Sequence, residues 1–186
     1  MPRVNKPATI LAAATLSITA GLTGAPAALA DGPNTPASIV AEIEARKWPV
    51  LEKGDENFQV KFAEYLLNDY GYYPHARPKG VFTEDLVKAA KKFQKAYKLP
   101  VTGKIDAETW NDMRDTYGQV GRGSRTQKVR AVQSALREGY YYNIIVDGIY
   151  GPRTESAVRN FQYKVGIGVD GIVGPITFRA LVTGGD

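Results

Sequence analysis

The chain contains no cysteine and only one histidine among its 186 residues. The absence of cysteine excludes disulfide bonds, a thiolate nucleophile and metal sites built on thiolates. His75 stands between two prolines, and a single imidazole cannot build a zinc site that needs several. The G-x-S-x-G motif of serine hydrolases is also missing. We therefore predict no metal ion, no cofactor and no familiar nucleophilic centre, although carboxylates are numerous enough to supply the pair that glycoside cleavage needs.

The most regular feature is a six-residue motif that occurs twice near the end of the chain. It reads Asp-Gly-Ile-Tyr-Gly-Pro over residues 147–152 and Asp-Gly-Ile-Val-Gly-Pro over residues 170–175. Asp-Gly favours a turn, because Asp hydrogen-bonds to its own backbone and Gly accepts a positive φ without steric penalty. Proline fits the first position of a helix, where its missing N–H costs nothing. Each copy of the motif therefore predicts a turn followed by the start of a helix.

This motif belongs to a longer internal repeat, in which residues from Trp48 onward align with residues from Tyr117 onward. An offset of 69 residues pairs the beginnings of the two copies. The offset then becomes 68, and it pairs residues 71–73 with residues 139–141, both Gly-Tyr-Tyr, and Phe82 with Tyr150. A fixed period of this kind indicates that each copy is one supersecondary unit.

Apolar residues in each copy recur at steps of three and four residues, and no alternating run extends beyond a few residues. In the second copy we expect helices over about 126–138, 152–165 and 175–181. The predicted fold is all-α, with tandem three-helix units over residues 48–116 and 117–186. A unit of about 70 residues buries only roughly 60% of its unfolded surface, so we expect the two units to touch through a short linker.

Residues 1–30 are typical of a secretory signal peptide. Arg3 and Lys6 precede an apolar run, and residues 28–30, Ala-Leu-Ala, fit a small-x-small cleavage site. A transmembrane anchor is the alternative, which the weakly hydrophobic content and the terminal Gly and Pro residues disfavour. We expect cleavage before Asp31 and a secreted chain with no membrane attachment. Residues 31–47 are then expected to form a flexible leader with one or two helical turns.

The motifs of the second copy resemble those of the type 1 peptidoglycan-binding domain family. They are Gly123, Val129, Val132-Gln133, Leu136, Asp147-Gly148, Tyr150-Gly151, Thr154, Ala157-Val158, Phe161-Gln162, Asp170-Gly171, Gly174, Thr177 and Leu181. The resemblance covers residues 48–183 as two copies. The first copy departs from the pattern, because Lys79, Thr83 and Thr102 replace the Asp, Gly and Asp of the family. Membership implies two orthogonal three-helix bundles that bind the bacterial cell wall non-covalently, often as the targeting module of a wall hydrolase.

We accordingly predict a secreted, monomeric protein that is not an enzyme and that binds peptidoglycan outside the cell or on the wall. Two alternatives stay open: a secreted wall hydrolase or an accessory to one, and a protein-interaction module that reuses the fold. An enzyme is disfavoured because no stretch outside the copies is long enough to build a catalytic domain. Nucleic acid is disfavoured because an exported chain would not meet it and the basic residues form no recognised docking motif.

The candidate ligand site lies on the second copy, where the Gly-Tyr-Tyr turn and the Asp-Gly turn are expected to meet. Tyrosines combine an apolar ring with a hydroxyl, a surface that suits sugars and short peptides. We expect Tyr150 to supply a flat face and Arg153 a charge for a stem-peptide carboxylate. The alternative is that alternate tyrosines pack on the second helix, and that the aspartates serve chiefly as turn formers. The full predicted set is Tyr141, Tyr142, Asp147, Tyr150 and Arg153.

The first copy has Phe82 at the position of Tyr150 and Asp85 at the position of Arg153. This exchange keeps an aromatic ring and reverses the charge. We therefore expect the first copy to bind an anionic group poorly and to act mainly as support, or as a weak second contact that adds avidity.

Overall fold

The protein is described here by a computed structural model, which covers residue 32 and residues 34–74 and 78–184. The predicted signal peptide and His75 lie outside the described residues. Over the described ranges the chain forms helices and isolated β-bridges but no strand, which confirms the all-α fold. None of the helices in these ranges is long and apolar enough to cross a membrane. The elements are α1 (Ala37–Ala45), α2 (Phe58–Asp69), α3 (Glu84–Tyr97), α4 (Ala107–Tyr117), α5 (Gln127–Ser134), the π-helix η2 (Ala135–Gly139), α6 (Pro152–Lys164) and α7 (Pro175–Thr183).

The helices begin where local sequence signals place them. The side chains of Asn57 and Thr126 accept the backbone N–H three residues on, at 2.9 and 3.3 Å, and thereby cap α2 and α5. Pro152 and Pro175 begin α6 and α7. The glycines of the two Asp-Gly turns have φ values of 78° and 76°, which confirms the predicted turn before each helix.

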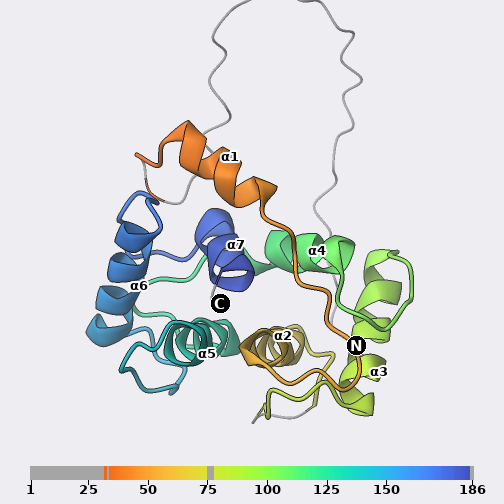
Figure 1. Ribbon diagram of the computed structural model, residues 1–186. Helices are drawn as coiled ribbons and strands as arrows, with labels where there is room; N and C mark the ends of the chain where they lie inside the picture. The colour runs from red at the N-terminus through yellow and green to blue at the C-terminus, as the bar shows by residue number, and fades with distance from the viewer. Residues whose placement is uncertain (1–31, 33, 75–77, 185–186) are drawn as a thin grey trace, which may run out of the picture.

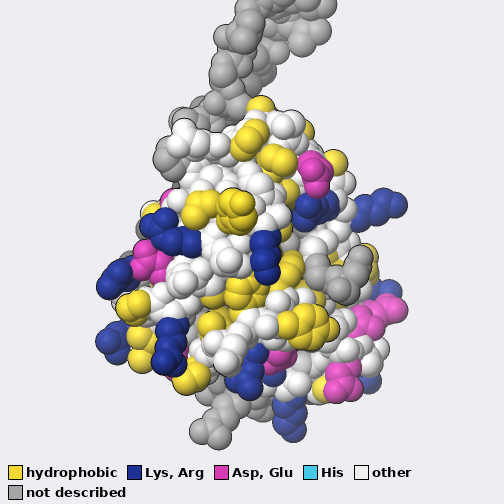
Figure 2. Space-filling view, turned by 60° about the vertical axis from the view of Figure 1, so that its left-hand side comes forward, with side chains coloured by type: hydrophobic (Ala, Val, Ile, Leu, Met, Phe, Trp, Pro, Cys, Tyr) yellow, Lys and Arg dark blue, Asp and Glu magenta, His cyan; other side chains and the backbone are white. Residues whose placement is uncertain are grey.

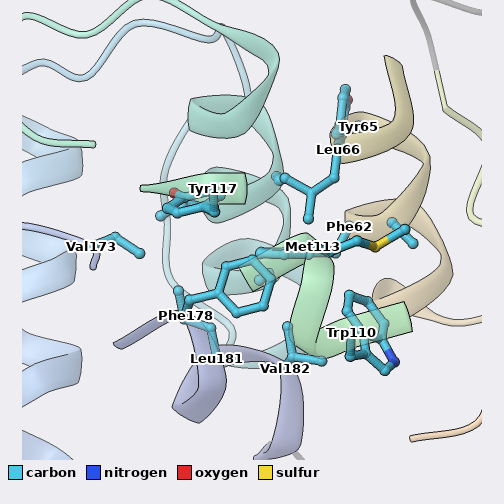
Figure 3. Packing of buried hydrophobic residues seen from close by; sticks show 14 of the residues in the cluster. Phe62, Tyr65, Leu66, Trp110, Met113, Tyr117, Val173, Phe178, Leu181 and Val182 are labelled. Atoms are coloured by element: carbon cyan, nitrogen blue, oxygen red, sulfur yellow. The ribbon is translucent and has the colours of Figure 1, made fainter. Parts of the chain in front are cut away.

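Equivalent helices of the two copies lie side by side. Helix α2 packs against α5 in the centre of the molecule, and α4 packs against α7, while α3 and α6 lie at opposite ends (Figure 1). The copies consequently share a single hydrophobic core. Phe178 of α7 lies among rings of the first copy, with centroid distances of 5.2 Å to Phe62 and 5.0 Å to Tyr117 (Figure 3). The expected contact between the units is thus a shared core and not a short linker alone.

The surface contacts between the copies are equally close. A Cβ atom at Gly139 would lie 2.8 Å from the Phe58 ring, so the backbone of η2 approaches α2 as only glycine permits. Next to this contact, Lys61 forms an ion pair with Glu138 at 2.7 Å. Glycine at the contact and the shared core together leave the two copies as one packed body.

The expected leader over residues 31–47 contains the helical turns that the sequence predicts, as helix α1. Helix α1 packs against α7, and its Ile43 side chain is fully buried. Arg179 of α7, only 6% exposed, donates to the carbonyls of Ile43, Glu44 and Arg46 at 2.7–2.8 Å. Its guanidinium carbon also lies 4.3 Å from the centroid of the Trp48 ring. Arginine satisfies the last carbonyls of α1 and so fixes the helix to the core.

The π-helix η2 changes the register between the copies. The Tyr70 hydroxyl donates to the Met113 carbonyl at 2.9 Å, and the Tyr140 hydroxyl donates to the Leu181 carbonyl at 3.1 Å. Tyr70 and Tyr140 are therefore equivalent, at an offset of 70 residues, and the predicted pairing of the two Gly-Tyr-Tyr segments is wrong. A π-helix accommodates one extra residue, so the offset rises to 70 at this point, whereas the sequence alignment lowered it to 68.

Candidate ligand-binding groove

A buried glutamine fixes the Asp-Gly turn at the start of α6. Gln133 of α5 is 1% exposed, and its Oε1 atom accepts the backbone N–H of Gly148 at 2.8 Å. Its Nε2 atom lies 2.8 Å from Asp147 Oδ1, 3.1 Å from the Ile149 carbonyl and 3.1 Å from Thr154 Oγ1. An amide can serve all these groups because it carries an acceptor and two donors. The turn is thus held between α5 and α6 in one conformation.

An open groove runs beside this turn. We call it the α6 groove, and it is bounded by residues 142–149 on one side and by residues 151–160 on the other. One section has a volume of about 640 Å³ and the next about 390 Å³. The sections are continuous, because Ile144, Ile145 and Arg153 line both. Figure 2, turned so that the α6 side comes forward, shows hydrophobic patches with Lys and Arg side chains between them.

Three of the five predicted site residues line this groove: Tyr142, Asp147 and Arg153. The Tyr142 hydroxyl donates to Asn160 Oδ1 at 2.9 Å, which orients its ring along α6. Arg153 is exposed and forms no hydrogen bond or ion pair with the described residues. Its guanidinium is therefore available to a ligand in the middle of the groove.

The carboxylate of Asp147 is committed to the turn. Partial burial acts to raise its pKa, but hydrogen bonds from the Ile149 backbone and the Gln133 side chain hold the pKa below its usual value. The side chain is still exposed, so Asp147 both shapes the turn and presents negative charge to the groove.

The prediction that Tyr150 offers a flat face to a ligand is wrong. Tyr150 is 1% exposed, and its hydroxyl donates to the Gly171 carbonyl at 2.8 Å inside the core. Burial raises the pKa of this hydroxyl. Its counterpart Phe82 is buried to the same extent, so this position is a core position in both copies. The inward side chain thereby joins the turn before α6 to the turn before α7.

Tyr141 is placed differently from the prediction as well. Its side chain is 86% exposed, but it does not line either section of the α6 groove. Its φ is 60°, a left-handed conformation that the first copy gives to Gly71, whose φ is 80°. The extra residue of η2 brings a tyrosine to this turn position. The structure thus separates Tyr141 from the three residues that it brings together.

Sequence reasoning missed several lining residues. Ile145 is 64% exposed and belongs to the apolar run Ile-Ile-Val over residues 144–146, which the sequence analysis did not consider. Ser156 and Asn160 line the groove together with Arg153. Their spacing of three and four residues puts them on one face of α6, and this spacing was the signal that could have found them.

The first copy differs at the positions that matter for this site. Asp85 replaces Arg153 and forms an ion pair with Lys88 at 3.4 Å. Glu64 replaces Gln133, and its fully buried carboxylate accepts the Gly80 N–H at 2.7 Å and the Tyr73 hydroxyl at 2.8 Å. Burial raises the pKa of Glu64. In the part of the chain that the structure describes, no group of three or more His, Cys, Asp or Glu side chains could hold a metal ion.

Comparison with known proteins gives the same two units. The model of the peptidoglycan binding domain family matches residues 57–113 and 125–181. The chain is 28% identical over 163 residues to the N-acetylmuramoyl-L-alanine amidase CwlL of Bacillus licheniformis, an alignment that covers 72% of this chain and 45% of the amidase. It is 41% identical over 63 residues to the spore cortex-lytic enzyme of Bacillus cereus, which covers 34% of this chain and 24% of that enzyme.

Among solved structures, the SleB N-terminal domain is 39% identical. The match covers 36% of this chain and 90% of that domain, with a TM-score of 0.34. The chain spans less than half of the length of either curated enzyme named above.

Proposed function

Because the chain belongs to the peptidoglycan-binding domain family, we propose that it binds bacterial peptidoglycan without cleaving it, through the α6 groove of its second copy. The family match covers more than half of the chain and both copies. The observation that carries the proposal is the exposed Arg153 guanidinium in a groove that also offers apolar and amide groups. We further propose that the chain acts outside the cell, after removal of residues 1–30, and as a monomer.

The lining of the groove matches the chemistry of the wall. Exposed Ile145 offers apolar surface to the ring faces and N-acetyl methyl groups of amino sugars. Asn143 and Asn160 supply amide donors and acceptors for sugar hydroxyls and peptide groups. Arg153 can form a charge-assisted, bidentate hydrogen bond with a stem-peptide carboxylate. An exposed contact of this kind is screened by salt, so retention on the wall should weaken as ionic strength rises.

A second candidate follows from the relatives. Their names describe an amidase and a cortex-lytic enzyme, and this chain matches each over less than half of its length. The chain would then act as an accessory that brings a separate wall hydrolase to its substrate. Binding to the wall is common to both candidates, so the same first experiment applies to both.

The experiment is co-sedimentation of the chain from Asp31 onward with purified, protein-free peptidoglycan sacculi. We compare the wild type with Arg153→Glu and with Arg137→Glu, which makes the same charge change at an exposed position outside the groove. A charge-assisted contact contributes roughly 1.5–3 kcal/mol, so Arg153→Glu should weaken retention by about tenfold or more. Arg137→Glu should be retained like the wild type. Equal retention of the two variants would show that the α6 groove is not the binding site.

The non-catalytic part of the proposal needs its own assay. Sacculi are incubated with the wild type, and soluble sugar fragments and newly formed amino groups are measured over time. We expect no release above the buffer control. Release that grows with protein concentration would show that the chain is itself a hydrolase.

A further inference from the structure

The α6 groove does not end at the Asp-Gly turn. A third depression, of about 560 Å³, lies where the two copies meet, between the end of α2 and the start of α5. It shares Asp147 and Ile149 with the adjoining section of the α6 groove. Its other lining residues include Asp69 of the first copy and Arg125 of the second. The three sections therefore adjoin one another from Asn160 on α6 to the C-terminal end of α2, and together we call them the trough.

The walls of this boundary section are fixed by contacts between the copies. Asp69 Oδ1 accepts the backbone N–H of Gln127 at 3.1 Å, which ties the end of α2 to the start of α5. Arg130 donates to the Val146 carbonyl at 3.0 Å. The same side chain lies against Gly148, where a Cβ atom would come within 2.8 Å of Arg130 Nε. The shared core thus holds a wall from each copy in a constant position.

We propose that this trough binds an extended glycan strand of the wall, which crosses the boundary between the copies, with one stem peptide reaching Arg153. The inference rests on the proposed function and names the ligand of the same site. The distance from Arg153 to Asn160 along α6 is about 10 Å by itself, from the helical rise per residue. The middle and boundary sections extend the trough beyond this stretch of α6.

The charge of the boundary section favours glycan over peptide. The carboxylates of Asp69 and Asp147 line it together with the guanidinium groups of Arg125 and Arg130, so its charges balance and a stem-peptide carboxylate gains no net attraction there. Sugar hydroxyls and acetamido N–H groups, in contrast, can donate to carboxylates. Ile149, which is partly exposed, offers apolar contact to a sugar ring between these polar groups. Arg125 is exposed and forms no side-chain hydrogen bond or ion pair with the described residues, so it can donate to sugar oxygens.

The test measures affinity as a function of strand length. Glycan strands of one, two and four disaccharide units, with stem peptides removed, are titrated against the wild type, Arg125→Ala and the control Arg137→Ala, each with its fold verified by circular dichroism. We expect the wild type and the control to bind four units at least about tenfold more tightly than one, a difference of about 1.4 kcal/mol. Arg125→Ala should lose most of this gain and keep the affinity for one unit.

Three results would overturn the inference. They are equal wild-type affinity for all strand lengths, an unchanged length gain in Arg125→Ala, or a free stem peptide that binds as tightly as the longest strand. In each case retention of the wild type on sacculi leaves the proposed function standing. If the wild type is not retained on sacculi, the proposed function itself is contradicted.

Discussion

The Oε1 atom of Gln162 accepts the backbone N–H of Gly171 at 2.8 Å. The same contact recurs in two other places, between Gln133 and Gly148 at 2.8 Å and between Gln94 and Gly103 at 2.9 Å. In each case a buried glutamine on one helix holds the turn that precedes the next helix. The positive φ of these glycines directs the N–H inward, so the amide and the turn require each other.

Replacing this glutamine should destabilise the protein strongly. In Gln162→Ala the Gly171 N–H and the Ile172 carbonyl lose their hydrogen bonds to the side chain, and each group left unsatisfied costs about 1–3 kcal/mol. Urea unfolding followed by circular dichroism should show a free energy of unfolding lowered by at least about 2 kcal/mol. Gln119→Ala, at an exposed position, is the control and should change it by less than about 0.5 kcal/mol. A similar effect of the two substitutions would contradict the proposed role of the buried amide.

Glu64 occupies the place of Gln133 in the first copy, and this makes stability depend on pH. Burial raises the folded-state pKa of Glu64 above its usual value of 4.5, although hydrogen bonds from Gly80 and Tyr73 and the charge of Lys61 act against the shift. A raised pKa means that the folded protein binds the proton more tightly than the unfolded chain. This contribution to stability is present below about pH 4.5 and is lost as pH rises through the folded-state pKa.

Glu64→Gln should therefore raise the melting temperature at pH 7, because the amide removes the cost that burial imposes on the charged carboxylate. The difference between variant and wild type should shrink as pH falls below about 4.5, because both side chains are then neutral. Glu84→Gln, at an exposed ion pair with Lys53, is the matched control and should not stabilise the protein at pH 7. A melting temperature of Glu64→Gln that lies below the wild-type value at pH 7 would show that the carboxylate is the better partner for Gly80 and Tyr73.

Tyr150 should behave as a core residue and not as a ligand contact. Tyr150→Phe restores the residue that the first copy has there and removes only the hydrogen bond to the Gly171 carbonyl, at a cost of about 0.5–1.5 kcal/mol. Tyr150→Ala deletes a buried ring, which for aromatic residues costs about 3–5 kcal/mol. Thermal unfolding separates the two variants, and sedimentation with sacculi should show wild-type retention for folded Tyr150→Phe. If Tyr150→Phe is stable but is not retained on sacculi, the Tyr150 hydroxyl contributes to binding after all.

The shared core predicts that the two copies unfold together. Both tryptophans, Trp48 and Trp110, precede the second copy, and Phe178 contacts both rings from α7 at centroid distances of 6.2 and 6.4 Å. Phe178→Ala should cost about 3–5 kcal/mol and lower the midpoint of the tryptophan fluorescence transition as much as that of the circular dichroism transition. Two separate transitions, with the fluorescence midpoint unchanged, would mean that the copies are independent domains.

The sequence by itself determined the helical character, the repeat and the turns. Local chemistry is sufficient for these features, because an Asp-Gly pair favours its turn and proline favours a helix start wherever they occur. The same motifs identified the family, since they record the contacts of Gln133 and Gln162 with the turns. Arg153 could be predicted to be exposed at the start of α6, because a charged residue is rarely buried without a partner.

Only the tertiary structure decided which surfaces the two copies leave exposed and which side chains lie on those surfaces. Tyr150 is buried while Ile145 is exposed, and the burial of Tyr150 depends on a distant partner, because its hydroxyl donates to the Gly171 carbonyl. The single extra residue of η2 packs Tyr140 against the core and leaves Tyr141 exposed, a change that pairwise alignment did not locate. Helix α1 is ordered by Arg179, which is 133 residues from Arg46 in the sequence but donates to its carbonyl. Contacts between such distant residues also bring Asp69 to the groove, so the boundary between the copies is a property of the shared core alone.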